Sequence, residues 1–342
     1  MRDTKPTAAQ SPLLTCDRVW KVFGPGAEML SKAAETDTLT LAAAVRDVSL
    51  SVSQGEIFCI MGLSGSGKST LVRCMTGLVP PTRGAIDLLG TNITKAGIAE
   101  LRNLRREKIS MVFQDFALLP HLTVLENVAF PLRVRGHARR QREDRAREMV
   151  TLVGLGDRES YYPHELSGGQ QQRVGIARSL TTDPQVWFLD EPFSALDPLI
   201  RQDMQDELLR LQSILHKTIV FITHDFDEAI RLASRIAIMR DGEVVQVATP
   251  EDLVLNPVDD YVARFTSKVA LADVMTVRTA MTAASDDTDG EILHPSARIR
   301  DVAIPVLDAG HPLAVADDAG RVLGELKPGT VIDILAERHK RP

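Results

Sequence analysis

The sequence predicts an α/β fold in which a mostly parallel sheet is covered by helices, with a small second domain towards the C-terminal end. Short strand-like apolar runs lie at 57–61, 186–189, 219–223 and 236–239, and they alternate with segments of helical periodicity. Such alternation is typical of parallel strands buried on both faces. The interval 98–181 is mostly helical by its pattern, which predicts a helical subdomain.

The composition is that of an ordinary globular protein. Hydrophobic residues make up 44% and charged residues 25% of the 342 residues, which excludes disordered and fibrous classes. The net charge of −6 argues against a generally basic surface for nucleic acid. Three irregularly spaced cysteines are too few for a disulfide framework or a zinc site, and they indicate a reducing compartment.

We expect a cytoplasmic protein. No stretch approaches the roughly 18 apolar residues that a membrane-spanning helix needs. The beginning of the chain, MRDTKPTAAQSPL, lacks the apolar centre of a signal peptide. Any link to a membrane would therefore come through a partner.

The patterns divide the chain into three parts. Residues 1–12 are expected to be a flexible N-terminal segment and 13–265 to form the α/β domain. Near residue 268 the character changes, and the later sequence PLAVADDAG followed by RVLGELKPGTVIDILAER predicts strand, turn, strand and helix. We therefore expect a second, small domain over 268–342.

A glycine-rich loop follows the first buried run. The sequence GLSGSGKS at 62–69 satisfies the P-loop pattern in the strand-to-helix context that the pattern requires. Glycines let backbone N–H groups turn towards phosphates, Lys68 reaches the β- and γ-phosphates, and Ser69 ligates Mg²⁺. A chance glycine-rich turn is the alternative, and the flanking strand and helix argue against it. The predicted nucleotide contacts are Gly62, Ser64, Gly65, Ser66, Gly67, Lys68, Ser69 and Thr70.

Two carboxylates end the next apolar run, VWFLDE at 186–191. A nucleotide-binding sheet places its Mg²⁺ and water chemistry at such strand ends. We expect Asp190 to hold Mg²⁺ through a water molecule and Glu191 to polarise the water that attacks the γ-phosphate. Alone, the pair could be a strand leaving the core, but together with the P-loop it predicts ATP hydrolysis.

The sequence LSGGQ at 166–170, followed by QQRVGIARSL, resembles the signature of the ATP-binding cassette (ABC) family. Ser167 and the amides of Gly168 and Gly169 stand at a helix N-terminus, which is a second anion-binding element. The resemblance implies a P-loop NTPase cassette with a mostly parallel sheet, an antiparallel β part and a helical subdomain. It also implies a head-to-tail homodimer that sandwiches two ATP molecules, with Gln170 in the nucleotide site.

Further residues match the family motifs. Gln114 corresponds to the glutamine that approaches Mg²⁺, His224 to the switch histidine that contacts the γ-phosphate, and Asp197 to the D-loop that crosses the dimer interface. Phe23 takes the position that stacks on adenine, with Trp20 as the rival. Either aromatic could instead belong to the core, and His224 could be a capped strand end. The implied Mg²⁺ contacts are Ser69, Gln114 and Asp190.

The choice of transported solute depends on two other segments. An insert between Phe23 and Val45 is similar to that of import ATPases for glycine betaine, proline betaine and choline. LADVMT near 271 and HPLAVADDAGRVLGEL near 311 resemble the two ends of a CBS module. Residues 268–342 hold one such module, whereas osmoregulated relatives carry two. We hypothesise that single modules pair across the dimer, and a tail without a ligand is the alternative.

The resemblance also implies partners and a location. Two integral membrane permease subunits would dock near 114–128, and an extracytoplasmic solute-binding protein would act indirectly. The ATPase would then be peripheral on the inner face of the bacterial cell membrane, with no nucleic acid bound. Competing hypotheses are an importer ATPase for another solute such as an amino acid or a metal chelate, a non-transport ABC ATPase, and an ATP-binding regulator without turnover.

Overall fold

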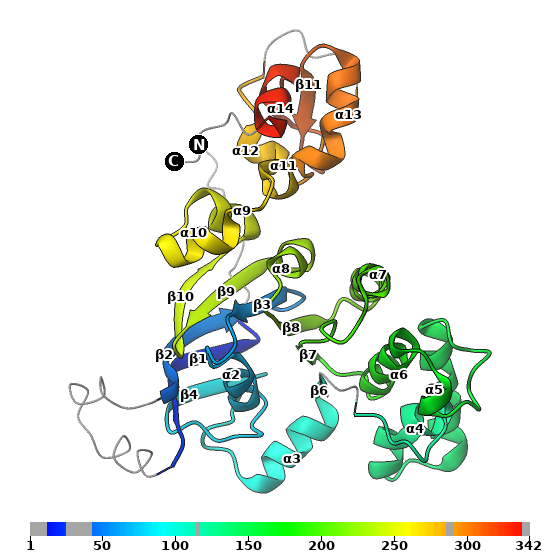
Figure 1. The fold of residues 1–342 in the computed structure, drawn as a ribbon. Helices are drawn as coiled ribbons and strands as arrows, with labels where there is room; N and C mark the ends of the chain where they lie inside the picture. The colour runs from blue at the N-terminus through cyan, green and yellow to red at the C-terminus, as the bar shows by residue number, and fades with distance from the viewer. Residues whose placement is uncertain (1–11, 25–42, 114–116, 285–290, 337–342) are drawn as a thin grey trace. The chain divides into compact units, whose positions relative to one another are not determined.

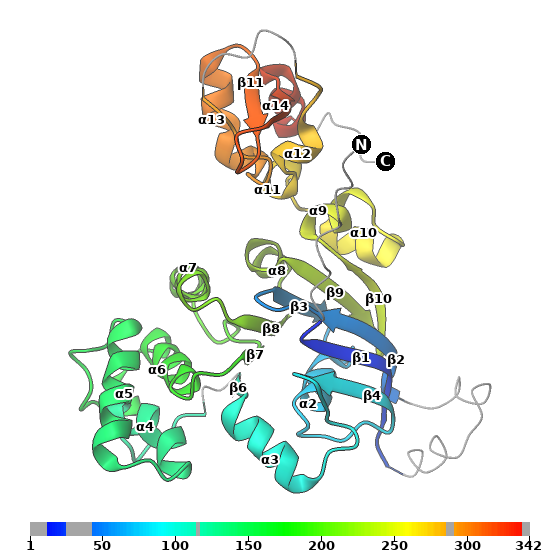
Figure 2. The ribbon, with the colours of Figure 1, turned by 180° about the vertical axis from the view of Figure 1, so that it is seen from behind.

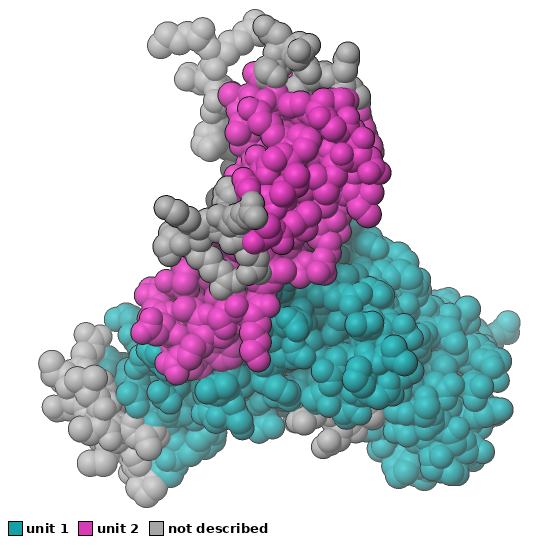
Figure 3. All heavy atoms as spheres, turned by 45° about the horizontal axis from the view of Figure 1, so that its top comes forward, with its two compact units in different colours: residues 1–247 teal, residues 248–342 magenta. Residues whose placement is uncertain are grey.

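The computed structural model describes residues 12–24, 43–113, 117–284 and 291–336 (Figures 1 and 2). The chain separates into two compact units, Met1–Val247 and Ala248–Pro342, which Figure 3 colours separately. In the described part of the chain, no helix is both long enough and apolar enough to span a bilayer.

The first unit contains a six-stranded sheet in the order β10-β9-β3-β8-β7-β6. Its central strands pair in parallel, and β3 and β8 are buried at every position, which explains their uninterrupted apolar sequences. The predicted parallel sheet is thereby confirmed. Its strands are β3 (Ile57–Gly62), β6 (Ile109–Val112), β7 (Val186–Asp190), β8 (Thr218–Thr223), β9 (Arg235–Arg240) and β10 (Glu243–Ala248).

A second, four-stranded sheet in the order β2-β1-β4-β5 is antiparallel. Its strands are β1 (Leu14–Val22), β2 (Ala43–Val52), β4 (Arg83–Leu88) and β5 (Thr91–Asn92). Helix α2 (Lys68–Met75) contacts β3 of the first sheet and β1, β2 and β4 of the second. Side chains from both sheets and from this helix form one hydrophobic core, so the apolar face of the helix that follows the glycine loop is held by both sheets.

The helical part begins with α3 (Ile98–Glu107) and continues with α4 (Val124–Val134), α5 (Arg139–Leu152), the 3₁₀ turn η2 (Pro163–Glu165) and α6 (Gly168–Leu180). Helices α4, α5 and α6 pack on one another, and Figure 1 shows them as a separate lobe beyond β6. Strand β6 lies inside the interval 98–181 and joins the main sheet beside β7. Helices α7 (Pro198–Leu215) and α8 (Phe226–Leu232) complete the unit.

The second unit is an α+β module. Its helices are α9 (Pro250–Leu255), α10 (Asp260–Thr266), α11 (Leu271–Val274), α12 (Val277–Ala280), α13 (Ile299–Ala309) and α14 (Pro328–Leu335), and its antiparallel strands are β11 (Leu313–Ala316) and β12 (Val322–Leu326). The order β11, turn, β12, α14 confirms the strand, turn, strand and helix predicted from the sequence.

The unit boundary at 247/248 lies before the change of character seen in the sequence near 268. Helices α9 and α10 pack on each other, and α9 also contacts α11. Glu251 on α9 accepts a 2.9 Å hydrogen bond from the Thr276 backbone N–H and one of 3.2 Å from its hydroxyl. These contacts join residues 248–266 to the C-terminal module. The sequence of 248–266 has no feature that predicts this packing.

One buried amide fixes the segment that leads into α4. Asn127 is fully buried, and its Nδ2 donates to the carbonyls of Leu119, Leu122 and Thr123 while its Oδ1 accepts from Leu119 N–H. Unpaired buried carbonyls are costly, so this side chain stabilises the loop.

Replacing this amide tests that role. Asn127→Ala should lower the free energy of unfolding by about 2–4 kcal/mol, because it leaves several buried backbone groups unpaired. Urea unfolding followed by circular dichroism measures the change, with the exposed Asn103→Ala on α3 as the matched control. Equal stability of the two variants would contradict the interpretation.

Candidate functional site

The loop between β3 and α2 has the conformation that its glycines allow. Gly65 and Gly67 have φ angles of 83° and 98°, in the left-handed region that side chains avoid. A Cβ atom at Gly67 would collide with the carbonyl of Ala44, and one at Gly62 with the carbonyl of Met239. Two neighbouring strands therefore leave room for glycine only, and the loop turns tightly into the N-terminus of α2.

The remaining loop residues have distinct positions. Ser64 and Gly65 are exposed at the tip of the loop, and Ser66 is buried beneath it. Ser69 and Thr70 lie on the first turn of α2, where backbone N–H groups are free of intrahelical partners. The predicted phosphate contacts thus share one short concave segment at a helix N-terminus, which is an arrangement that binds anions.

Lys68 is buried against this loop. Its Nζ donates hydrogen bonds of 2.8 Å to the carbonyl of Gly62 and 3.0 Å to that of Leu63. Burial lowers the pKa of Lys68, while the carboxylates of Glu191 and Asp190 raise it. The ammonium group therefore lies between the loop and two acidic side chains, where a phosphate chain would need a cation.

Asp190 ends β7 and is also buried. Its Oδ1 accepts a 3.2 Å hydrogen bond from Ser69 Oγ, which joins the end of β7 to the first turn of α2. Burial raises the pKa of Asp190, and the Ser69 hydrogen bond lowers it. The structure thus brings together two oxygen-bearing side chains that are 121 residues apart in the sequence.

Glu191 has an unusual backbone conformation for a residue with a side chain. Its φ angle is 45°, and it is held there by hydrogen bonds of 3.1 Å from its N–H to the Ile222 carbonyl and 3.0 Å from Ser194 Oγ to its own carbonyl. Such strain persists only where the surroundings impose it, and it is found most often at functional sites. The strain turns Glu191 out of the strand direction of β7.

Glu191 and His224 lie next to each other at the ends of neighbouring strands. Strands β7 and β8 are parallel neighbours, so the residues after their carboxyl ends come together. His224 Nδ1 lies 3.2 Å from Glu191 Oε2, and the imidazole remains largely exposed. A carboxylate oriented by an imidazole is the arrangement expected of a general base that acts on water.

The signature residues form a capped helix start. Ser167 is the N-cap of α6, where its Oγ accepts from Gln170 N–H at 3.4 Å and Gln170 Oε1 accepts from Ser167 N–H at 3.0 Å. Gly168 is exposed, while a Cβ atom at Gly169 would collide with Ile200 of α7. Figures 1 and 2 both show β6 between α2 and α6, so the signature is separate from the glycine loop of its own chain.

The other predicted residues are Asp197, Gln114 and Phe23. Asp197 is the N-cap of α7, and its Oδ1 accepts a 3.1 Å hydrogen bond from Ile200 N–H. Gln114 lies outside the described residues. Phe23 is 59% exposed, whereas Trp20 is 9% exposed and packs beside Val22 in the core, so of the two aromatics Phe23 is the accessible one.

One group of residues beside this site was not predicted from the sequence. Thr223, Arg201 and Glu228 form a hydrogen-bonded and ionic cluster next to His224. The sequence THDFDEA holds two of them at 223 and 228, but Arg201 comes from α7. Only the packing of α7 against α8 brings the three together.

These features define a P-loop ATPase. A strand, glycine loop and helix have the phosphate-binding pattern, two carboxylates stand at the end of β7 in the same sheet, and the histidine that follows β8, the strand between β3 and β7, faces the second carboxylate. An ABC transporter family profile matches residues 45–194. The chain belongs to the ABC transporter family of ATP-binding subunits, as its motifs predict.

Several relatives support that assignment. The trimethylamine N-oxide transport system ATP-binding protein TmoW of Ruegeria pomeroyi is 51% identical over 332 residues, covering 95% of this chain and 97% of the relative. TmoW of Pelagibacter ubique is 48% identical over 96% of this chain and 99% of the relative. The glycine betaine/proline betaine transport ATP-binding protein ProV of Salmonella typhimurium is 48% identical, over 78% of this chain and 68% of the relative.

A solved structure confirms the cassette fold. A dimeric ATP-binding cassette in a post-hydrolysis state with ADP and Pi has a TM-score of 0.60 and 34% identity, covering 69% of this chain and 98% of that chain.

The position of Lys68 generates a prediction about binding. Lys68→Ala should weaken ATP binding by about 10- to 100-fold, because a buried charged donor beside the phosphate loop is lost. Fluorescence titration with a labelled ATP analogue measures the change, and the exposed Lys108→Ala is the control. An unchanged dissociation constant for Lys68→Ala would show that this lysine does not contribute to ATP binding.

Proposed function

We propose that the chain powers the import of a methylated amine solute, as the ATPase pair of a bacterial transporter with two permease subunits. Trimethylamine N-oxide is the first candidate solute, followed by glycine betaine and choline. This order rests on the share of this chain that each relative matches. The trimethylamine N-oxide relatives match 95–96% of this chain, including the C-terminal module, whereas the glycine betaine relative ProV matches 78%.

The nucleotide would bind with its phosphates on the loop at 62–69 and its adenine on Phe23. Lys21 Nζ lies 5.0 Å from the centroid of the Phe23 ring, so a cation holds one face of that ring. We infer that adenine stacks on the other face.

The residues at the strand end fit a magnesium ion. Ser69 Oγ and Asp190 Oδ1 are 3.2 Å apart, and hydroxyl and carboxylate oxygens are the donors that Mg²⁺ prefers. We assign Ser69, Asp190 and Gln114 as its protein contacts. Bound Mg²⁺ would offset the negative charge of the phosphates.

Glu191 would act as the general base for hydrolysis. One carboxylate oxygen faces His224, which leaves the other to accept a proton from the attacking water. The imidazole, held at 3.2 Å, keeps the carboxylate in this orientation and is exposed enough to contact the γ-phosphate. Two side chains from neighbouring strand ends thereby position the water in line with the phosphate.

The signature supports a head-to-tail homodimer. Ser167, Gly168 and Gly169 present a helix N-terminus that is separate from the glycine loop of the same chain. A second copy could supply this element to the nucleotide. Gln170 and Asp197 cap α6 and α7, which supports a role in holding the two loops in the shape that a partner would meet.

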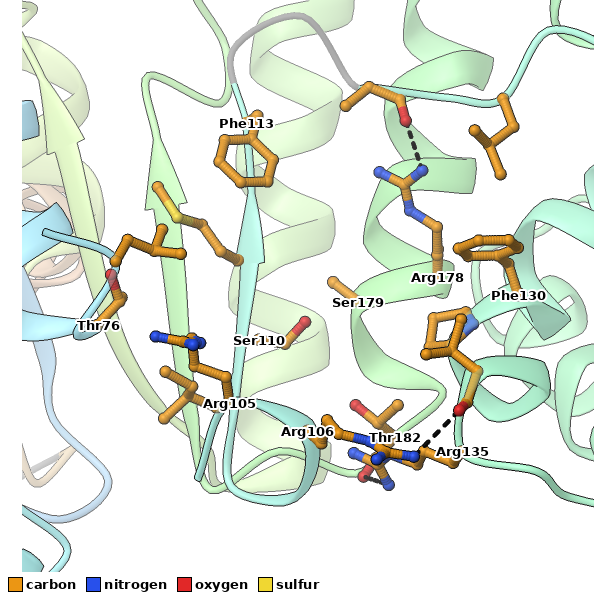
Figure 4. Close-up of a pocket in the computed structure, with 17 residues that line it drawn as sticks. Thr76, Arg105, Arg106, Ser110, Phe113, Phe130, Arg135, Arg178, Ser179 and Thr182 are labelled. Carbon is orange, nitrogen blue, oxygen red and sulfur yellow. Dashed lines mark hydrogen bonds between the residues drawn. The ribbon is translucent and has the colours of Figure 1, made fainter. Parts of the chain in front are cut away.

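A groove beside the helical lobe supports the docking of a permease. It has a volume of about 470 Å³ and lies between α3, β6, α4 and α6. Figure 4 shows Phe113, after β6, and Phe130, from α4, on its walls. Arginine side chains surround this apolar surface: Arg105, Arg106, Arg135 and Arg178. A permease segment with apolar and acidic residues would fit this groove. Docking there would place the chain on the inner face of the cell membrane. The solute-binding protein would act on the outer side.

A hydrogen bond connects the wall of the groove to the segment that begins at residue 117. Arg178 Nη1 donates a 2.6 Å hydrogen bond to the carbonyl of Ala117, whose φ angle of 47° is strained. Both residues line the groove. A permease segment in the groove would therefore contact Ala117, which lies three residues after Gln114 in the sequence.

The C-terminal module resembles a single CBS unit in its order of elements. Bridges at Thr282 and Leu293 precede α13, and β11, β12 and α14 follow. Helix α13 exposes Ile304 and Leu307, and α14 exposes Ile332. We propose that two modules pair and add contacts to the ATPase dimer, because these apolar side chains favour a partner.

Substitution of the general base tests the hydrolytic assignment. Glu191→Gln should bind ATP and dimerise, and its kcat should fall by about 100-fold or more, because the amide cannot take the proton from water. Phosphate release measures kcat, and gel filtration with ATP measures dimerisation. Glu148→Gln on the exposed surface of α5 is the control. Hydrolysis by Glu191→Gln at the normal rate would show that another group is the base.

Uptake in cells tests the solute. Cells with the gene should accumulate radiolabelled trimethylamine N-oxide, and cells that lack the gene or carry Glu191→Gln should not. Glycine betaine and choline are measured in the same way to rank the three solutes. Unchanged uptake of all three in the deletion strain would overturn the methylated-amine assignment and leave the ATPase assignment standing.

A further inference from the structure

A buried carboxylate is tied to the residues next to His224. Glu228 on α8 is 4% exposed, and its Oε2 accepts a 2.7 Å hydrogen bond from Thr223 Oγ1. The same hydroxyl accepts a 3.0 Å hydrogen bond from Asp225 N–H. Thr223 and Asp225 flank His224 in the chain, so one hydroxyl group holds the backbone on both sides of the imidazole.

One guanidinium group joins this carboxylate to the loop before α7. Arg201 Nη1 donates a 3.3 Å hydrogen bond to Asp225 Oδ2, and Arg201 Nε lies 3.7 Å from Glu228 Oε1. Arg201 Nη2 donates a 3.3 Å hydrogen bond to the carbonyl of Leu196. Arg201 therefore connects the loop before α7 with the turn that carries His224.

The protonation of the Glu228 carboxyl group depends on the charge of Arg201. Burial raises the pKa of Glu228, while the Thr223 hydrogen bond and the charge of Arg201 lower it. A buried carboxylate that loses its cation takes up a proton or moves towards water, because an unpaired charge is costly in the interior. Protonation or movement of the Glu228 carboxylate would alter its hydrogen bond with the Thr223 hydroxyl.

We propose that Arg201 is a positioning residue for ATP hydrolysis. Through Glu228 and Thr223 it holds the backbone that carries His224. Through Leu196 it links that position to the loop before α7, which carries the proposed dimer contact. The inference rests on the hydrolytic roles proposed above for the histidine and the carboxylate that it faces.

The structure offers a matched control between the same two helices. Arg231 on α8 donates a 2.6 Å hydrogen bond to the exposed Asp206 Oδ1 on α7 and a 3.4 Å hydrogen bond to Gln205 Oε1, and its own side chain is half-buried. Removing this ion pair perturbs the packing of α7 on α8 but leaves the cluster around Glu228 intact. Exposed ion pairs contribute little to stability.

The test is steady-state ATP hydrolysis by the full-length chain. Arg201→Gln should lower kcat by about 10-fold and change the KM for ATP by less than about 2-fold, because the phosphate loop is untouched. Arg201→Lys should recover part of the loss. The double variant Arg201→Gln/Glu228→Gln should recover most of it, because no unpaired charge remains buried.

Three results would overturn the proposal. The first is a normal kcat for Arg201→Gln, the second an equal loss in Arg231→Gln, and the third a double variant no faster than Arg201→Gln. Thermal unfolding is recorded for each variant, and rates are compared where all are folded. If Arg201→Gln does not fold, Arg201→Lys decides the matter: a lower kcat at constant KM is expected, and normal kinetics would refute the inference.

A parallel measurement separates this inference from the proposed function. Glu191→Gln is assayed beside the Arg201 variants. If Glu191→Gln hydrolyses ATP normally, the hydrolytic role proposed for Glu191 fails, and the inference that rests on that role fails with it. If Glu191→Gln is inactive while Arg201→Gln has a normal kcat, only the positioning role fails.

Discussion

Parallel pairing of β3 with β8, and of β8 with β7, places the carboxyl ends of three strands at one edge of the main sheet. The glycine loop leaves β3 there, Asp190 and Glu191 end β7, and His224 follows β8. Every other feature of the site depends on this alignment, because the side chains of distant segments meet only where those strands stop. The neighbouring antiparallel sheet then encloses α2, and Lys68 is held beside the same edge.

Several groups at this edge are in conformations or surroundings that are unfavourable on their own. Glu191 has a left-handed backbone, and Asp190 and Lys68 are buried. The left-handed backbone of Glu191 costs on the order of 1–3 kcal/mol and persists because the surrounding structure imposes it. Strands β3 and β8 are buried throughout, so the core can hold such groups without rearranging. The fold therefore keeps the site in place before any nucleotide binds.

The proposed head-to-tail dimer rests on two helix starts, at α2 and at α6, which lie on different sides of β6. One chain can use only one of them on a given nucleotide, which favours a working unit of two copies. Arg201 adds a connection inside each copy, from Leu196 before α7 to the residues that flank His224. A change at the loop that faces a partner would thus reach the hydrolytic pair through a few polar contacts.

The sequence alone determined the class of protein and predicted most of the candidate site, because the decisive motifs are local. A strand, glycine loop and helix are adjacent in the chain, and a capping box such as Ser167 with Gln170 spans four residues. The tertiary structure decided the rest. It buried Trp20 and exposed Phe23, placed the unit boundary at 247/248, and brought Arg201 to Glu228 from another helix. Burial and long-range pairing depend on how distant elements pack, which no local pattern records.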